Sequence, residues 1–547
     1  MGRARAPLFA LLCVISLYYA FVVSAGTFGL LGWTSDFYDA LAEGFRAGHL
    51  YLRTQPTPEL LGRANPYTYT TADDWDAWLW DASLYNGHYY IYWGPVPALL
   101  LWALKAMIPY AGTIHDQWLV LFFALMRLYA GTALIITFAR DHNPTLPRWA
   151  LYLALLVFGL ASPTPYFLAR PLVYEASIAA GQGFLCLGLY WAYLGLQHPR
   201  VQARWFVAAG SCFGCALASR ASLIISAPLI VLVTAWCALS ARGLPHKARE
   251  LVAPLSALGG PVAASLVLYA WYNQARFGAF FEFGLHYQLT GRPYETAGRF
   301  FLPNLASYLG AAVQWSCEFP FVWLPEQREL SSLITWPSDY DLGDAENGER
   351  VGGVLVATTL CWLWGVWLWR AGRWVCLKYR RGVAPKTSSQ RERWLILSAC
   401  AVITSGAPAS RLYLASMRYL EDAASGLLLG AIAAGFWLVR PPAARTPAAA
   451  RRRRLGPVLF GSLGLHTVFV GVCLGFTGYA DTFRKENAVL FRELQRKLSV
   501  CELRDTLRRL DPLSLQPGGR GTKYVAWTDA SQLEPRHACS QRPPARP

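Results

Sequence analysis

Residues 33–52 read WTSDFYDALAEGFRAGHLYL and residues 65–97 read NPYTYTTADDWDAWLWDASLYNGHYYIYWGPVP; they form an acidic, aromatic stretch between apolar runs. The stretch from 33 to 97 contains three arginines, no lysine and eight carboxylates: Asp36, Asp39, Glu43, Glu59, Asp73, Asp74, Asp76 and Asp81. Most of the rest of the chain is apolar or basic. The side of the molecule on which this acidic stretch lies therefore decides the arrangement of everything after it.

The composition indicates a membrane protein. Of the 547 residues, 54% are hydrophobic, and the mean hydropathy is +0.27. Apolar runs of about 20 residues recur along the chain, which is the length that crosses ~30 Å of hydrocarbon. Lipid tolerates only helices or closed barrels. We therefore predict an all-α polytopic membrane protein.

The net charge of +17 does not indicate nucleic acid. Lysine and arginine sit mainly in short loops between apolar runs and in the C-terminal tail. Positively charged loops are retained in the cytoplasm, which explains the basic loops between the runs. Most of the twelve cysteines fall inside apolar runs, where cysteine acts as a small hydrophobe. We predict membrane lipids as partners, no nucleic acid and no metal site.

The first apolar run, residues 8–31, follows the basic sequence MGRARAP and is typical of a signal anchor. Arg3 and Arg5 are expected to hold the N-terminus in the cytoplasm, so the acidic stretch emerges outside. Ten further spans are predicted at 117–139, 149–167, 173–196, 205–219, 221–240, 251–272, 353–370, 394–410, 422–439 and 456–477.

The run at 89–110 reads YYIYWGPVPALLLWALKAMIPY. Whether it crosses the membrane decides on which side every later loop lies. If it crosses, the basic loops 241–250, 371–393 and 441–454 face outward and the acidic loop 273–352 faces inward. That inverts the usual charge distribution. Gly94, Pro95 and Pro97 also break a helix near its start. We predict a re-entrant or juxtamembrane segment, about eleven spans, and an extracytoplasmic C-terminus in a cell (inner or plasma) membrane.

The predicted domains are a membrane module over 1–477 and an extracytoplasmic tail over 478–547. The module carries external loops at 33–116 and 273–352. The tail section 486–510 has helical periodicity. Cys501 and Cys539 either pair in an oxidising compartment or stay as two free thiols.

Asp36 lies about one turn beyond the first span, at the expected membrane–water boundary. Transfer of a sugar from a lipid phosphate needs a carboxylate that takes the acceptor proton and cations on the leaving phosphate. Asp36 is therefore a candidate base, although Thr34, Ser35 or Asp36 can equally be a helix N-cap. Asp39 would share one helical face with Asp36.

Asp81 is a second candidate, followed by a turn at Asn86–Gly87. The alternative is a loop aspartate that bonds its own backbone. Asp73, Asp74 and Asp76 are interpreted as a solvated run or a weak cation site, and a divalent cation is left undetermined.

Candidate phosphate ligands are the arginines beside the spans. Arg411 and Arg418 are seven residues apart, hence expected on one helical face, and arginine can grip phosphate bidentately. Arg418 is preferred; pairing with Glu421 or Asp422 is the alternative.

Two more arginines are candidates for the phosphate. Arg276 lies just outside a span and either contacts phosphate or snorkels. Arg127, inside a span, should face the protein interior and pair with a loop carboxylate or the lipid phosphate.

We predict that Glu282, His286 and Tyr419 belong to the site that binds the acceptor or the sugar. Glu282 and His286 are i and i+4 if FFEFGLHYQL (280–289) is helical, and such a pair can line a site or simply bond together.

Several of these segments resemble a known family. DFYDALA (36–42) with GHLY (48–51), DASLYNGHYYIYWGPVPAL (81–99), NQARFGAFFEFGLHYQL (273–289) and MRYLED (417–422) are similar to integral-membrane glycosyltransferases of the GT-C superfamily. The bacterial branch, with protein O-mannosyltransferases and aminoarabinose transferases, is the most similar. The resemblance covers about 8–477.

The resemblance implies a GT-C-like fold, a polyprenyl-phosphate sugar donor, chemistry on the outer face with inversion, and Asp36 as base. The acceptor would be a glycan, a lipid or a protein. The chain departs from the family where Phe37 replaces a frequent second acid and where a His-Pro-Pro motif is missing. The alternatives are a transporter or flippase of a lipid-linked saccharide, and a structural or signalling membrane protein. The sequence halves show no repeat, which favours the enzyme over a transporter.

Overall fold

A computed structural model describes residues 5–68, 78–108, 112–198, 202–241, 249–290, 295–325, 335–341, 349–381, 389–440 and 447–501. Within these ranges the regular secondary structure is helical apart from two short antiparallel hairpins: β1 (Ser83–Tyr85) with β2 (His88–Tyr90), and β3 (Gln314–Trp315) with β4 (Val322–Trp323). The predicted all-α polytopic fold is confirmed.

Eight helical segments in the described part of the chain are long and apolar enough to cross a membrane. They are α1 (Arg5–Val23), α6 (Asp116–His142), α7 (Arg148–Leu160) with α8 (Thr164–Leu168), α9 (Val173–Gln197), α11 (Leu223–Ala241), α12 (Arg249–Phe277), α17 (Met417–Val439) and α18 (Pro447–Thr477). The three remaining predicted spans fall on less apolar or interrupted helices: α10 (Gln202–Ser219), α14 (Val354–Ala357) to α15 (Trp364–Arg381), and α16 (Gln390–Ile403).

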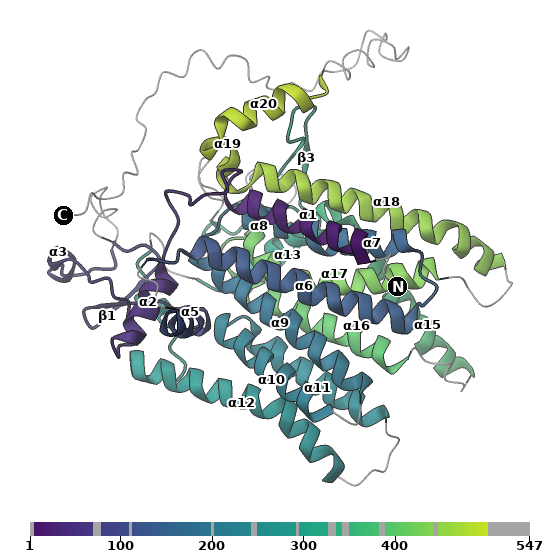
Figure 1. The fold of residues 1–547 in the computed structure, drawn as a ribbon, viewed down its shortest axis with the longest axis horizontal. Coiled ribbons are helices and arrows are strands. Elements are labelled where there is room, and N and C mark those ends of the chain that lie inside the picture. The colour runs from purple at the N-terminus through teal and green to yellow at the C-terminus, as the bar shows by residue number, and fades with distance from the viewer. Residues whose placement is uncertain are drawn as a thin grey trace.

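The elements that do not cross gather at one end of the bundle (Figure 1). In that view α2 (Phe37–Arg46), α3 (Pro58–Leu61), β1 and α5 (Val96–Met107) lie on the left, and α19 (Thr482–Glu486) and α20 (Ala488–Leu498) lie above. The opposite end carries the C-terminal end of α15 and the start of α18. The described part of the acidic stretch therefore lies at the opposite end from the last turn of α15 and the first turn of α18, which flank two of the basic loops.

The predicted dip at 89–110 becomes the short helix α5. Its 12 residues rise only about 18 Å, which is less than the ~30 Å of a hydrocarbon core. Pro95 precedes the helix and Pro97 lies in its first turn. The turn at Asn86 and Gly87, both with positive φ, closes the β1–β2 hairpin as this dipeptide predicts.

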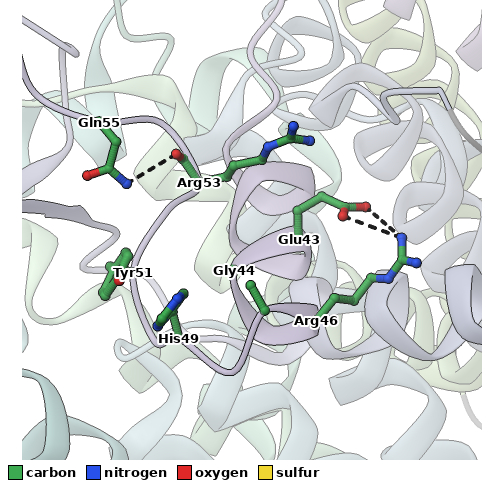
Figure 2. Close-up of a pocket in the computed structure, with 8 residues that line it drawn as sticks. Glu43, Gly44, Arg46, His49, Tyr51, Arg53 and Gln55 are labelled. Atoms are coloured by element: carbon green, nitrogen blue, oxygen red, sulfur yellow. Dashed lines mark hydrogen bonds and ion pairs between the residues drawn. The ribbon is translucent and has the colours of Figure 1, made fainter.

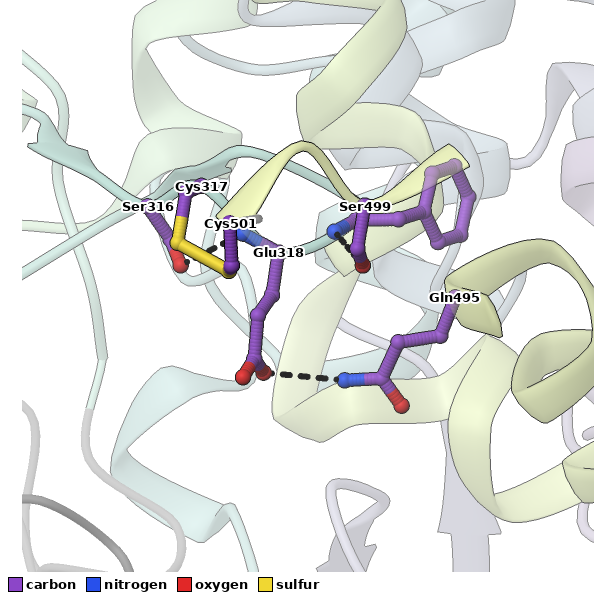
Figure 3. The surroundings of a disulfide bond; sticks show 7 residues. Ser316, Cys317, Glu318, Gln495, Ser499 and Cys501 are labelled. Carbon is purple, nitrogen blue, oxygen red and sulfur yellow. Dashed lines mark hydrogen bonds between the residues drawn. A yellow bond between two sulfur atoms is a disulfide. The ribbon is translucent and has the colours of Figure 1, made fainter. Parts of the chain in front are cut away.

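The C-terminal tail is tied to the loop 273–352 by a disulfide between Cys317 and Cys501 (Figure 3). The amide of Val500 also donates to the Cys317 carbonyl at 2.8 Å, and Gln495 Nε2 donates to Glu318 at 3.1 Å. The prediction that Cys501 either pairs with Cys539 or stays free is wrong. Its partner comes from 184 residues earlier, and Cys539 lies outside the described residues.

Candidate active site

Asp36 lies at the start of α2 with an exposed side chain. Among the described contacts it makes no capping hydrogen bond; instead Asp116, from the first turn of α6, accepts from the amides of Phe37 (3.1 Å) and Tyr38 (3.3 Å). Asp116 thus provides hydrogen-bond acceptors for amides that have no partner within α2. The carboxylate of Asp36 is thereby left available at the surface.

The segment before Asp36 is fixed against the start of α9. Ser35 Oγ donates to Asp116 at 2.6 Å and accepts from the amide of Val173 at 3.0 Å. Thr34 Oγ1 donates to the carbonyl of Pro171 at 3.3 Å. These bonds place Asp36 beside the chain segment that connects α8 to α9.

Asp39 does not share the environment of Asp36. It is buried, its carboxylate lies 2.6 Å from Lys105 Nζ of α5, and it accepts from the amide of Ile114 at 3.1 Å. Lys105 also pairs with Glu43 at 2.9 Å. Asp39 therefore joins α2 to α5, and its lone pairs are occupied by partners within the protein.

Asp81 sits in a strained backbone position with φ +66°, and for non-glycine residues such strain is common at functional sites. Gln288 Nε2 donates to its carboxylate at 3.0 Å and lies 3.3 Å from the hydroxyls of Tyr92 and Tyr174. Burial raises the pKa of Asp81, while the charges of Arg170 and Arg418 act in the opposite direction.

Arg418, in the first turn of α17, lies in the same cluster as Asp81. Its Nη2 is 2.7 Å from Glu349 Oε1, and its guanidinium carbon is 4.5 Å from the ring centre of Tyr174 and 5.3 Å from that of Tyr419. Three residues that the sequence nominated separately, Asp81, Arg418 and Tyr419, are thus brought together.

A second arginine completes the cluster. Arg170, between α8 and α9, has its Nη1 3.7 Å from Glu349 and its guanidinium carbon 4.4 Å from the ring centre of Tyr479. The charge of Glu349 and then burial raise the pKa of Tyr479, so this hydroxyl stays protonated. Tyr479 is the second residue of the tail, so the tail contributes directly to the cluster.

Several buried polar atoms in this cluster have no hydrogen-bond partner within the described part of the chain. On the donor side they are Nε and Nη1 of Arg418 and Nη1 of Arg170; on the acceptor side there is Oε2 of Glu175. Buried polar groups are normally satisfied. The start of α9 and the start of α17 also direct their positive dipole ends here, which favours an anion.

Sequence reasoning missed Arg170, Glu175, Glu349 and Tyr479. A signal existed for the first two, because they flank the start of an apolar run, where charge is costly and marks function. Nothing in the local sequence distinguished Glu349 or Tyr479. Their position depends on the packing of distant segments.

The other predicted phosphate ligands lie elsewhere. Arg276 is buried and committed to the protein: its Nη1 donates to the carbonyl of Ile91 at 2.5 Å and its Nη2 to Asn273 at 2.7 Å. It is therefore not a snorkelling side chain. Arg411 ends a short 3₁₀ turn and is exposed, and the chain between it and Arg418 is not helical. The expectation that these two share one helical face is wrong.

Arg127 is buried within α6, with its Nε 3.5 Å from Glu421 and 3.0 Å from Ser425 Oγ. Asp422 pairs instead with Arg220 at 3.0 Å. The partner of Arg127 is thus a carboxylate of α17 rather than one from an external loop. Because Glu421 pairs with Arg127 and Asp422 pairs with Arg220, neither is the partner of Arg418, which pairs with Glu349.

Glu282 and His286 do form the predicted pair, with Nδ1 2.7 Å from Oε2. The backbone is not an α-helix there, because Gly284 has φ +98° and a 3₁₀ turn (Leu285–Tyr287) follows. The His286 side chain is 83% exposed. This pair lies at the surface of the loop.

A hollow of about 450 Å³ opens beside α2 (Figure 2). Its wall includes Glu43, Arg46 and Arg53, and its floor carries Tyr51, whose ring stacks on His49 at 4.6 Å and on His88 at 4.0 Å. The hollow contains neither the Asp81–Arg418 cluster nor Asp36. The chemistry and this open space are therefore separate features.

Within the described ranges, no group of three or more His, Cys, Asp or Glu side chains is placed so that it could hold a metal ion. Asp73, Asp74 and Asp76 lie outside the described residues. The weak cation site considered for these three aspartates stays a prediction.

Comparison with known proteins gives distant similarities. No family model matches the chain, and no curated protein matches it. Solved structures of the oligosaccharyltransferase of Archaeoglobus fulgidus are similar. The apo form has 14% identity and a TM-score of 0.43 over 86% of this chain and 56% of that one. The form in complex with an inhibitory peptide and a dolichol-phosphate has 15% identity and a TM-score of 0.41 over 85% of this chain and 55% of that one. The chain thus spans about half the length of these structures.

Proposed function

We propose that the chain is a membrane glycosyltransferase that moves a sugar from a polyprenyl-phosphate donor to an acceptor at the loop end of the bundle. The observation that supports this most is the set of unpartnered buried atoms around Arg418. Open N–H donors on Arg418 and Arg170 suit phosphate oxygens. The open acceptor on Glu175 suits a sugar hydroxyl, so a sugar phosphate would satisfy both kinds of group.

In the proposed reaction, Asp36 accepts the proton of an acceptor hydroxyl as that oxygen forms a bond to the sugar carbon. The bond from this carbon to the phosphate oxygen breaks, and the phosphate leaves with its electron pair. Arg418 and Arg170 stabilise the charge that develops on it. A single displacement of this kind inverts the configuration at the sugar carbon. Asp81 would hold Gln288 and the tyrosines in place beside the arginines.

The disulfide supports placing this end of the bundle outside the cytoplasm. Disulfides persist in oxidising compartments, and Cys317–Cys501 belongs to the same end of the molecule as α2 and α5. The N-terminus would then be cytoplasmic and the tail extracytoplasmic. The hollow beside α2 offers an acceptor a surface at the same end.

The buried pairs Arg127–Glu421 and Arg220–Asp422 are the observation that would favour a transporter, because charges within spans often mark substrate paths. In this protein each carboxylate already has an arginine partner. We therefore keep a flippase of lipid-linked saccharides as the second candidate.

The test is transfer of radiolabelled sugar from defined polyprenyl-phosphate donors by the purified protein in proteoliposomes. Asp36→Asn should lower the rate about 10²- to 10⁴-fold, as expected for loss of a general base. Glu59→Gln, an exposed acid of the same loop, is the matched control and should retain activity. Full activity of the Asp36 variant would exclude this base. Movement of the intact donor between leaflets without sugar transfer would favour the flippase.

A further inference from the structure

A second polar pocket lies at the opposite end of the bundle from the candidate active site. It encloses about 290 Å³ and is lined by residues from the C-terminal ends of α6 and α17 and from α15 and α16, among them His142, Arg370, Ser389, Glu392, Trp437 and Arg440. Nothing in the proposed transfer reaction uses these residues.

The helix α17 fixes the height of this pocket in the membrane. Arg418 lies in its first turn, and Arg440 directly follows its last residue. The 22 residue steps from Arg418 to Arg440 correspond to about 33 Å of helix rise, close to the ~30 Å thickness of a hydrocarbon core. The pocket therefore sits at the membrane–water boundary of the other leaflet. Trp437 and Trp369, whose rings are 6.2 Å apart, suit that interfacial level.

The pocket carries excess positive charge. The guanidinium of Arg452 lies 4.4 Å from the ring centre of Trp437, and that of Arg370 lies 5.3 Å from it. Arg370 is neutralised by Glu392 at 2.8 Å. Within the described residues, no ion pair to a carboxylate is found for Arg440 or Arg452.

Arg452, which stacks on the lining residue Trp437, also has a donor that is unused within the described residues. Arg452 donates Nη2 to the carbonyl of Arg440 at 2.9 Å, whereas its Nε is buried and has no hydrogen-bond partner in the described part of the chain. Three arginines with one carboxylate, an unused donor and a cavity of this size match an anion larger than chloride. A phosphate group accepts several such bonds at once.

We propose that this pocket binds the phosphate of an anionic lipid headgroup in the leaflet opposite the candidate active site. Basic pockets between membrane helices bind phosphate-bearing headgroups in this way. Trp437 would lie beside the glycerol region, and Arg440 and Arg452 would contact the phosphate oxygens. The lipid would join α6, α15, α16 and α17 at an end where the loops are basic.

The test is native mass spectrometry of the full chain released from nanodiscs that contain phosphatidylglycerol or only phosphatidylcholine. The wild type should retain phosphatidylglycerol. Arg440→Gln should reduce the retained fraction about fivefold, from roughly 1 kcal/mol for each basic residue at a membrane surface. Arg204→Gln is the matched control, because Arg204 is also an exposed arginine but lies outside the pocket, in the first turn of α10.

A second variant should change the retention of phosphatidylglycerol in the opposite direction. Glu392→Gln removes the negative charge beside Arg370 but keeps a residue suited to the first turn of α16, where Ser389 caps the helix. It should raise retention of phosphatidylglycerol. A parallel experiment measures the binding of inorganic phosphate to the protein in detergent. Saturable phosphate binding without lipid retention would assign the pocket to a soluble phosphate compound and overturn the lipid proposal. Equal retention by wild type, Arg440→Gln and Glu392→Gln would also overturn it.

Discussion

Arg418 makes one close ion pair, with Glu349, and leaves two nitrogen atoms, Nε and Nη1, buried without hydrogen-bond partners in the described part of the chain. A guanidinium held in this way is already oriented before a ligand arrives. The aromatic rings of Tyr174 and Tyr419 fix its plane. The residue can therefore bind a phosphate without losing much side-chain entropy.

Replacing Arg418 by lysine tests this arrangement at constant charge. Arg418→Lys loses the bidentate fork, and one hydrogen bond between charged groups contributes about 1.5–3 kcal/mol, so kcat/KM for the lipid-phosphate donor should fall about 10- to 100-fold. Arg411→Lys is the control, since Arg411 is exposed and outside the cluster. Steady-state kinetics over a range of donor concentrations would measure both. Equal losses in the two variants would contradict a phosphate role for Arg418.

Asp81→Asn should raise the thermal stability of the protein and lower its activity. Burial raises the folded-state pKa of Asp81, so its ionisation destabilises the fold above that pKa and has no such effect below the unfolded value near ~3.9. Asparagine removes the charge and tolerates positive φ. The variant should have a higher Tm than the wild type at neutral pH, the difference should fade as the pH falls towards 4, and sugar transfer should decrease.

The measurement is thermal unfolding in detergent at several pH values, with transfer assays in parallel. Asp39→Asn is the contrast, because it breaks a buried pair with Lys105, and such a loss costs about 3–5 kcal/mol. It should lower the Tm. A lower Tm for Asp81→Asn at neutral pH would show that its carboxylate is stabilised rather than strained.

At the scale of elements, α5 decides the topology. It packs against α2 through the buried Lys105 and is too short to cross. The ends of this segment should therefore lie on the same side of the membrane. Cysteines introduced at Asn86 and at Thr113 should both react with an impermeant maleimide added to intact cells.

The native Cys376, exposed at the far end of α15, provides an internal control, because it should be labelled only after permeabilisation. Labelling of Asn86→Cys without Thr113→Cys in intact cells would mean that 89–110 crosses the membrane. The basic loops would then face outward, and the proposed orientation would be wrong.

For the molecule as a whole, the span pattern could be predicted from sequence because a single physical requirement, ~30 Å of apolar helix, governs it. The short α5, with 12 residues, agrees with the prediction from loop charge that 89–110 does not cross, and the topology itself stays a prediction. The site was only partly predictable: Asp81, Arg418 and Tyr419 were nominated one by one, but nothing local showed that they meet. Glu349, which pairs with Arg418, and Asp116, which caps α2 in place of Asp36, are non-local partners. Only the packed bundle reveals them.

The disulfide Cys317–Cys501 gives the last prediction, because it connects the tail to the second external loop across 184 residues. Closing a loop of that length stabilises by up to about 5 kcal/mol in the chain-entropy model, and less if helices persist in the unfolded state. Cys317→Ser and Cys501→Ser should lower the Tm equally, and the double variant should lower it no further. Since Tyr479 stacks on Arg170 at the start of the same tail, transfer activity should fall with them. Cys539→Ser should leave both unchanged, and peptide mapping without reductant should recover a Cys317–Cys501 crosslink; a Cys501–Cys539 crosslink would contradict this arrangement of the tail.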